Sequence, residues 1–293
     1  MTGKVYVAKE STSQEILAKL GSGGNEMFVI NAILSDDEAL NEWGFRQDGI
    51  GSVINSAFDL NSAALAACGT VAEIAANKSV MAVIGANTAA VRACSRSKVL
   101  VAAMEDEHVL AAGKGYTVFD VGDVVTLNYG GTPTEFRVVH KNYRTQNKIV
   151  LVSENALAET KWIYINKSES YRSSNLRTYL NATVLSAFSE EIQAAMAASA
   201  SHPSQYDEVL NDKIWALSYN EVGAGKITTD HADNFALDYF KDAASRKKTL
   251  NGTAYGWWLR TKNGDTSAYY IDTAGNVSSS SSGTFGVVPA FEI

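Results

Sequence analysis

Small polar residues and apolar residues recur with a period of nine or ten positions between residues 67 and 104. The successive units are ACGTVAEIA (67–75), ANKSVMAVIG (76–85), ANTAAVRACS (86–95) and RSKVLVAAM (96–104). Small polar residues open each unit and apolar residues close it. Repeats of this length are too short to bury an apolar face alone, so they must stack or oligomerise. We therefore predict short helices that pack on one another.

Positions seven apart in the same Ala-rich segment are also compatible with a coiled coil. One series is Ile74, Met81 and Thr88, and the other is Asn77, Ile84 and Val91. Asn77 and Thr88 would lie in the seam, where polar residues set register and oligomeric state. Two interpretations stay open: short helices in a trimeric stalk, which we favour, and an Ala-rich helical domain within a monomer.

After residue 113 the pattern becomes typical of strands alternating with a few helices. Strands are expected at 118–121, 124–127, 136–140, 149–153 and 214–218, with 136–140 and 149–153 paired antiparallel. Helices are expected at 173–180, 189–200 and 234–244, and near the start of the chain at 11–20 and 36–43. This unequal mixture predicts the α+β fold class.

Near the C-terminal end, apolar blocks bracket a polar stretch rich in Tyr, Ser, Asn, Asp, Thr and Gly. The blocks include GWWLR (256–260) and GVVPAF (286–291). Large aromatic residues dominate protein cores, so core positions are expected for Trp257, Trp258, Leu259, Phe285, Pro289 and Phe291. Arg260 is expected to be a structural hydrogen-bonding centre at the edge of this core.

The residues of the polar stretch that have no evident core role are predicted to form a ligand-binding face. They are Asn263, Asp265, Thr266, Tyr269, Tyr270, Asp272, Asn276, Ser278, Ser280 and Ser282. Tyr supplies rigid contact area, while Ser and Asn supply adaptable hydrogen bonding. Neighbouring residues of a strand point to opposite sides, so only one of Tyr269 and Tyr270 needs to face a ligand. The alternative is a solvated, loop-rich surface.

Several ordered motifs resemble the DUF6273 family over roughly residues 115–293. They are SSNLRTYLN (173–181), FSEE (188–191), DKIWALS (212–218) and the C-terminal pattern WWLR…AYY…D..G.V…G.VPAF. The resemblance implies a C-type-lectin-like fold, shared with formylglycine-generating enzymes and with the variable proteins of diversity-generating retroelements. Val288 stands where Arg is common in the family, so a salt bridge from that Arg is not expected here. The enzymatic relatives depend on cysteines in this domain, and this chain has none after Cys94.

Composition limits the classes of partner. The 293 residues have room for about two domains. The net charge of −7 argues against nucleic-acid binding, which usually requires a basic stripe. No apolar run approaches the ~20 residues that span a bilayer. The N-terminal MTGKVY lacks the apolar core of a signal peptide, so we expect release by lysis or as part of a particle. Cys68 and Cys94 are expected to be buried free thiols.

The sequence carries no pattern that predicts catalysis, a cofactor or a metal site. The four histidines, His108, His140, His202 and His231, are widely spaced and have no Cys beside them. Asp230, Asp233 and Asn234 could hold Ca²⁺, but a helix N-cap is the favoured interpretation. The serines 278–282 have no nearby His to act as a base. We therefore expect a binding protein without a cofactor, not an enzyme.

These features favour a receptor-binding tail-fibre or tail-tip protein of a bacteriophage or phage-like particle. Residues 1–48 are expected to attach to other tail proteins, and 49–110 to form the Ala-rich helical segment of a homotrimer. Residues 111–293 are expected to bind a host-surface glycan or protein, with several copies strengthening weak single sites. The alternatives are a bacterial surface adhesin with the same domain, a structural virion decoration protein, and a glycan hydrolase.

Overall fold

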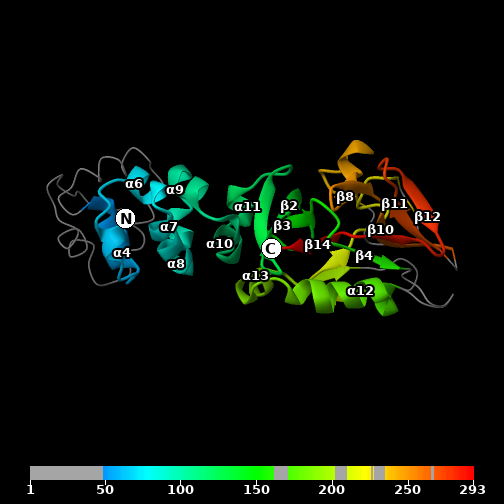
Figure 1. Cartoon of the computed structure of the whole chain (residues 1–293), viewed down its shortest axis with the longest axis horizontal. Helices are drawn as coiled ribbons and strands as arrows, with labels where there is room; N and C mark the ends of the chain where they lie inside the picture. The colour runs from blue at the N-terminus through cyan, green and yellow to red at the C-terminus, as the bar shows by residue number, and fades with distance from the viewer. Residues whose placement is uncertain (1–48, 162–170, 202–209, 226, 228–234, 265–266) are drawn as a thin grey trace, which may run out of the picture. The chain divides into compact units, whose positions relative to one another are not determined.

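The computed structural model describes residues 49–161, 171–201, 210–225, 227, 235–264 and 267–293 (Figure 1). The chain divides into two compact units, Met1–Lys114 and Gly115–Ile293. The helices expected at 11–20 and 36–43 lie outside the described residues. Over the described part of the chain, no helix combines the length and the apolar character that a membrane crossing requires.

The first unit, in its described part, is built from short helices. They are α4 (Gly49–Ala57), α5 (Ala63–Ala66), α6 (Val71–Ala76), α7 (Lys78–Gly85), α8 (Thr88–Cys94), α9 (Lys98–Ala103) and α10 (Asp106–Ala111). Isolated helices of this length are unstable in water, so each depends on apolar side chains that it buries against its neighbours. Fully buried examples are Ile54, Leu65, Ile74, Ile84 and Leu100.

The repeat in the sequence corresponds to successive helix N-caps. Asn77, Asn87 and Ser97 precede α7, α8 and α9, and each side chain accepts a hydrogen bond from a backbone N–H of the following first turn. The residues three positions after these caps, Val80, Ala90 and Leu100, are all 0% exposed. Each unit therefore consists of a polar cap and a short helix that turns its apolar side inward, which confirms the prediction of short packed helices.

The heptad interpretation of the same segment is wrong. Asn77 ends α6 and caps α7, and Thr88 is the first residue of α8. The seven-residue series therefore crosses helix boundaries, whereas a coiled coil requires a continuous helix. The homotrimer loses this support and stays a prediction.

Both cysteines belong to the first unit, and both are buried free thiols, as predicted. Burial raises the pKa of the Cys94 thiol to about 12. Because the thiolate is the reactive form, Cys94 acts as a small apolar core residue.

The second unit combines two five-stranded sheets with short helices, which confirms the α+β fold class. The first sheet has the order β1 (Val124–Tyr129), β2 (Thr132–Lys141), β3 (Ile149–Ser153), β14 (Pro289–Glu292) and β7 (Trp215–Ala216), with every neighbouring pair antiparallel. The antiparallel pairing predicted for 136–140 and 149–153 is confirmed as β2–β3.

The second sheet contains the strands of the polar C-terminal stretch. Its order is β12 (Val277–Ser280), β11 (Ser267–Ile271), β10 (Trp257–Asn263), β13 (Thr284–Val287) and β4 (Ala158–Lys161). Only β10 and β13 run parallel among these described pairs. Two further hairpins pair β5 (Ser199–Ser201) with β6 (Leu210–Asp212), and β8 (Lys248–Leu250) with β9 (Thr253–Tyr255).

Short helices complete the second unit. They are α11 (Gly115–Val118), the 3-10 helix η1 (Tyr171–Ser173), α12 (Asn175–Tyr179), the π-helical turn η2 (Leu180–Val184), α13 (Glu190–Ala195) and the 3-10 helix η4 (Ala244–Arg246). Part of the core is a cluster of Phe136, Phe188 and Phe291, whose ring centroids lie 5.4 to 5.7 Å apart. These three rings join β2, β14 and the segment before α13.

Several predicted elements of the second unit differ in extent. The strand expected at 118–121 is wrong, because residues 115–118 form α11 and the N–H of Phe119 bonds to the carbonyl of Gly115. The strand expected at 214–218 is reduced to β7. The helix expected at 189–200 ends at Ala195, because the chain turns there and the N–H of Ala197 bonds to the carbonyl of Glu292.

The helix expected at 234–244 is absent from its described residues, 235–244, apart from the start of η4. The N–H of Leu237 bonds to the carbonyl of Glu221, and the N–H of Tyr239 bonds to the carbonyl of Val139. Tertiary partners therefore replace the local bonds that a helix would make.

Candidate ligand-binding face

Most of the predicted site residues lie on the hairpin formed by β11 and β12 (Figure 1). The N–H of Asp272 bonds to the carbonyl of Asn276 at 2.8 Å, and the N–H of Gly275 bonds to the carbonyl of Asp272 at 3.0 Å. Gly275 has a φ of +88°, so the connection is a type I turn followed by a left-handed bulge residue. The Asp272 carboxylate accepts the N–H groups of Ala274 and Asn276 at 2.9 and 2.8 Å. Asp272 thus holds the turn in place.

The two adjacent tyrosines point to opposite sides of the sheet. Tyr270 lies opposite Ser278, and Tyr269 lies opposite Ser279 on the neighbouring strand. The Tyr269 ring makes an edge-on contact with Tyr219, with ring centroids 4.9 Å apart. Only Tyr270 shares a side with Ser278, because cross-strand partners project from the same face. This separation agrees with the expectation that one of the two tyrosines faces away.

On its side of the sheet, Tyr270 belongs to an aromatic stack. The rings of Tyr270 and Phe285 are 3.8 Å apart and inclined by 20°. Their strands, β11 and β13, flank β10, whose Trp258 meets Phe285 edge-on at 4.7 Å and Tyr270 at 6.1 Å. Trp258 is 1% exposed, whereas Tyr270 and Phe285 are half-buried. The stack therefore has a buried base and a partly accessible upper layer.

Phe285 was predicted as a core residue, but its side chain is only half-buried and belongs to this site. Its ring packs against the backbone of Gly283, where an added Cβ would lie 2.2 Å from Cε2 of Phe285. The signal in the sequence is a glycine two positions before an aromatic residue, directly after the serine run. The other predicted core residues, Trp257, Trp258, Leu259, Pro289 and Phe291, are buried.

Serine hydroxyl groups border the stack. Ser278 lies opposite Tyr270, and Ser280, two positions further, projects from the same side. The Ser280 hydroxyl accepts the N–H of Gly283 at 3.0 Å. We call Trp258, Tyr270, Ser278, Ser280 and Phe285 the Tyr270 face. Its described residues offer aromatic area and hydroxyl groups, and none of these five side chains is charged.

The remaining predicted site residues do not join the Tyr270 face. Asn263 ends β10, and its carbonyl accepts the Ser267 hydroxyl at 2.6 Å. Ser282 is exposed beyond the end of β12. Asp265 and Thr266 lie outside the described residues, as do Asp230, Asp233 and Asn234, the Ca²⁺ candidates. Where the structure describes the chain, no group of three or more His, Cys, Asp or Glu side chains could hold a metal ion.

A buried ion network fixes the strand beneath the aromatic stack. Arg260 of β10 donates to the carbonyl of Ala216 and to both carboxylate oxygens of Glu221. Arg144 and the Tyr143 hydroxyl also donate to Glu221, at 3.0 and 2.5 Å. Burial alone would raise the pKa of the Glu221 carboxyl, but the charges of Arg260 and Arg144 and the hydrogen bonds from Arg260 and Tyr143 lower it. Arg260 is thus the structural centre that the sequence predicted.

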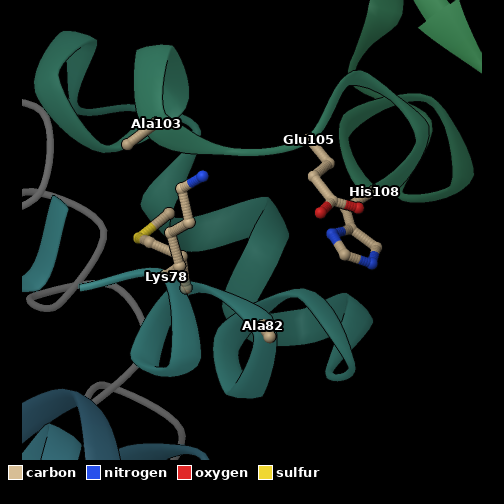
Figure 2. Close-up of a pocket in the computed structure, with 6 residues that line it drawn as sticks. Lys78, Ala82, Ala103, Glu105 and His108 are labelled. Atoms are coloured by element: carbon tan, nitrogen blue, oxygen red, sulfur yellow. The ribbon is translucent and has the colours of Figure 1, made fainter. Parts of the chain in front are cut away.

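A separate pocket of about 220 Å³ lies in the first unit. Its lining residues are Lys78, Met81, Ala82, Ala103, Glu105 and His108. Figure 2 shows Lys78 on one side of the opening and Glu105 with His108 on the other. None of the residues predicted to bind ligand lines this pocket, so it is a feature of the helical unit alone.

Residues 146–293, just over half of the chain, match the family described as Domain of unknown function (DUF6273). The chain belongs to the DUF6273 family. The match begins at residue 146, later than the limit of about 115 expected from the motifs. No curated protein and no solved structure matches the chain.

The DUF6273 region includes the complete Tyr270 face and the Arg260–Glu221 pair. It does not include β1 and β2, although both belong to the same sheet as β3 and β14. In this chain, two strands that precede the DUF6273 match therefore complete one of its sheets.

Proposed function

We propose that this DUF6273 protein recognises a host-surface glycan through the Tyr270 face, without catalysis. In this proposal it is a receptor-binding tail-fibre or tail-tip protein of a bacteriophage or phage-like particle, and its second unit has a C-type-lectin-like fold. The observation that carries the proposal is the half-buried stack of Tyr270 on Phe285, bordered by Ser278 and Ser280.

The chemistry of this face suits a sugar ring. A pyranose has one side of C–H groups, which packs on an aromatic ring, and a rim of hydroxyl groups. Binding sites for small ligands typically combine aromatic walls with a few polar groups that fix orientation. The Tyr270 ring supplies the wall, and Ser278 supplies a hydroxyl group that both donates and accepts hydrogen bonds.

The position of the stack supports recognition by a prepared surface. Trp258 beneath it is 1% exposed, and β10 is anchored by the Arg260–Glu221 pair. Rigid aromatic side chains lose little conformational entropy on binding. A single shallow face of this kind binds weakly, so a particle that carries several copies gains strength from multivalency. We propose that the helical unit serves this display by bringing three copies together on the assembled particle, whereas the isolated chain is a monomer at low concentration.

The test uses labelled full-length protein and a panel of bacterial strains. Wild-type protein is expected to adsorb selectively to a few strains, and soluble monosaccharides are expected to compete. Tyr270→Ala should reduce adsorption at least tenfold. Tyr270→Phe, which keeps the ring, should retain most of it. Tyr269→Ala is the matched control, because it removes the adjacent ring on the opposite side of the sheet.

The outcomes separate the proposal from its rivals. Equal adsorption by wild type and Tyr270→Ala, with both proteins folded by circular dichroism, would show that the Tyr270 face is not the site. Adsorption to no strain would favour a structural decoration protein. Adsorption that sugars do not compete with, but that protease treatment of the cells abolishes, would indicate a protein receptor. Location of the native protein on a bacterial cell surface, and not on a particle, would favour the adhesin.

A further inference from the structure

Among the strands that the structure describes, β12 is at the edge of its sheet and pairs with β11 alone. The bond from the N–H of Asp272 to the carbonyl of Asn276 shows which opposite residues of this hairpin are hydrogen-bonded to each other. In an antiparallel pair, opposite residues alternate between bonded and non-bonded positions. The backbone N–H and C=O groups of Ser278 and Ser280 therefore bond to β11. Those of Val277 and Ser279 point outward, in the plane of the sheet, from its edge.

This edge lacks three of the features that prevent strand pairing: charged side chains, proline and a bulge. Native edge strands are commonly protected by charged side chains, proline or bulges. The segment 277–282, VSSSSS, contains no charge and no proline, and the pairing of β12 with β11 continues without a register shift. Ser279 is exposed. The opposite edge strand of the same sheet, β4, carries Glu159 and Lys161 in its sequence.

We propose that β12 pairs antiparallel with β12 of a second copy of this chain, so that Ser278 lies opposite its own counterpart and Val277 lies opposite Ser279. The two sheets then continue into one another about a two-fold axis perpendicular to them. Each copy contributes the outward N–H and C=O groups of Val277 and Ser279, which are the groups that an added strand requires.

A second copy is the occupant that the edge fits best. The strand is short and its side chains are small and uncharged, so two identical strands meet without like-charge repulsion. This matters because each whole chain carries a net charge of −7, which disfavours contact through its charged surfaces. The interface is small, and small interfaces are weak, so the dimer forms at the high local concentration of a particle.

The pairing has a geometric consequence for ligand binding. A two-fold axis perpendicular to a sheet leaves the same face of both copies on the same side. The two Tyr270 faces would therefore look in one direction, with their β11 strands three strand spacings apart, about 14 Å. This consequence rests on the proposed function, whereas the pairing itself does not. Two linked sites raise avidity above that of one site by mass action.

The first test measures self-association of the full chain by sedimentation velocity over a range of concentrations. Wild type is expected to rise from the mass of one chain toward twice that mass. Ser279→Pro removes an outward N–H and is tolerated at an edge, and Ser279→Lys adds a protecting charge. Both variants should stay monomeric while keeping the wild-type melting temperature. Thr273→Lys, at the exposed tip of the turn, is the charge-matched control and should dimerise normally.

A second measurement separates this proposal from the proposed function. Ser279→Lys should bind a soluble monosaccharide as wild type does, but should bind a surface coated with the same sugar at least tenfold more weakly. A wild type that stays monomeric at every concentration would overturn the pairing, as would association that both Ser279 variants retain. Dimerisation without any sugar binding would leave the pairing in place and overturn the proposed function.

Discussion

Arg260 and Glu221 form an ion pair of two hydrogen bonds whose side chains are 2% and 0% exposed. Arg260 belongs to β10 and Glu221 to the segment after β7, so the pair joins the two five-stranded sheets of the second unit. Removing one partner of a buried pair leaves the other charge uncompensated, which typically costs about 3–5 kcal/mol. The pair therefore contributes strongly to keeping β10 in its place.

The Glu221 carboxyl should make stability depend on acid. Its folded-state pKa is lowered below the ordinary value of 4.5, so its contribution is complete above pH 4.5 and is lost as the pH falls toward the folded-state pKa. Glu221→Gln should be destabilised at pH 7 by about 3 kcal/mol and should lose less stability than wild type between pH 4.5 and pH 3. Urea denaturation at several pH values measures both effects. If the unfolding free energy of wild type and of Glu221→Gln fell equally between pH 4.5 and pH 3, this assignment would be contradicted.

Lys248 should also make stability rise with pH, but in an alkaline window. Burial lowers the pKa of its ammonium group from 10.5 to about 8, although nearby Glu154 raises it. Between pH 8 and pH 10.5 the unfolded chain keeps a proton that the folded chain has released, so stability should rise with pH in this window. Lys248→Met should be more stable than wild type at pH 7, by up to roughly 3 kcal/mol, and should lack the rise. Lys247→Met, at an exposed neighbouring position, is the control. It should change neither the stability at pH 7 nor its rise between pH 8 and pH 10.5.

Gly275 should tolerate substitution much less than Gly252. Both have positive φ, +88° and +77°. A Cβ on Gly275 would lie 1.8 Å from the carbonyl oxygen of Ala243, while a Cβ on Gly252 meets nothing within 4 Å. Gly252→Ala should cost about 1–2 kcal/mol, from backbone strain alone. Gly275→Ala should cost more and distort the β11–β12 turn. Thermal denaturation of the two variants compares them directly, and equal losses would argue against the close approach of Ala243.

The cap of α8 offers a test of the helical repeat. Asn87 accepts the N–H groups of Ala89 and Ala90, both at 3.0 Å, and its amide donates to the carbonyl of Phe58. Asn87→Ala should destabilise the first unit by about 1 kcal/mol. Thr88→Ala, an exposed change in the same helix, should have little effect. Amide hydrogen exchange across residues 49–114 measures both, and an unchanged pattern in Asn87→Ala would contradict the capping role.

The sequence predicted those parts of the fold whose physical cause is local. The polar residues that open each repeat unit are helix caps, and short runs rich in apolar residues marked β2 and β3. The heptad interpretation failed because spacing alone does not reveal that Asn77 interrupts the helix by capping the next one. The helix at 234–244 failed because Leu237 and Tyr239 bond to distant carbonyl groups, which no local pattern records.

The residue types of the candidate site could be predicted from the sequence, but the set of residues that share one face of the sheet could not. The mixture of Tyr and Ser pointed to the β11–β12 hairpin, and strand alternation indicated that one of the two tyrosines would face away. Phe285 could not be placed on the same face from the sequence, because it reaches Tyr270 across the intervening strand β10. Asp272 was predicted as a ligand contact, although its carboxylate is engaged by the backbone of its own turn.

The place of β14 in its sheet determines when the second unit can fold. β14 lies between β3 and β7, and Ile293 exchanges two backbone hydrogen bonds with Ile149. β13, just before it, joins β10 to β4 in the other sheet. During synthesis, both sheets therefore wait for residues 284–293 to leave the ribosome, and the strands made earlier keep open edges until then. Because such long-range pairings form slowly and exposed edges aggregate, the yield of folded protein should depend on how quickly β13 and β14 insert.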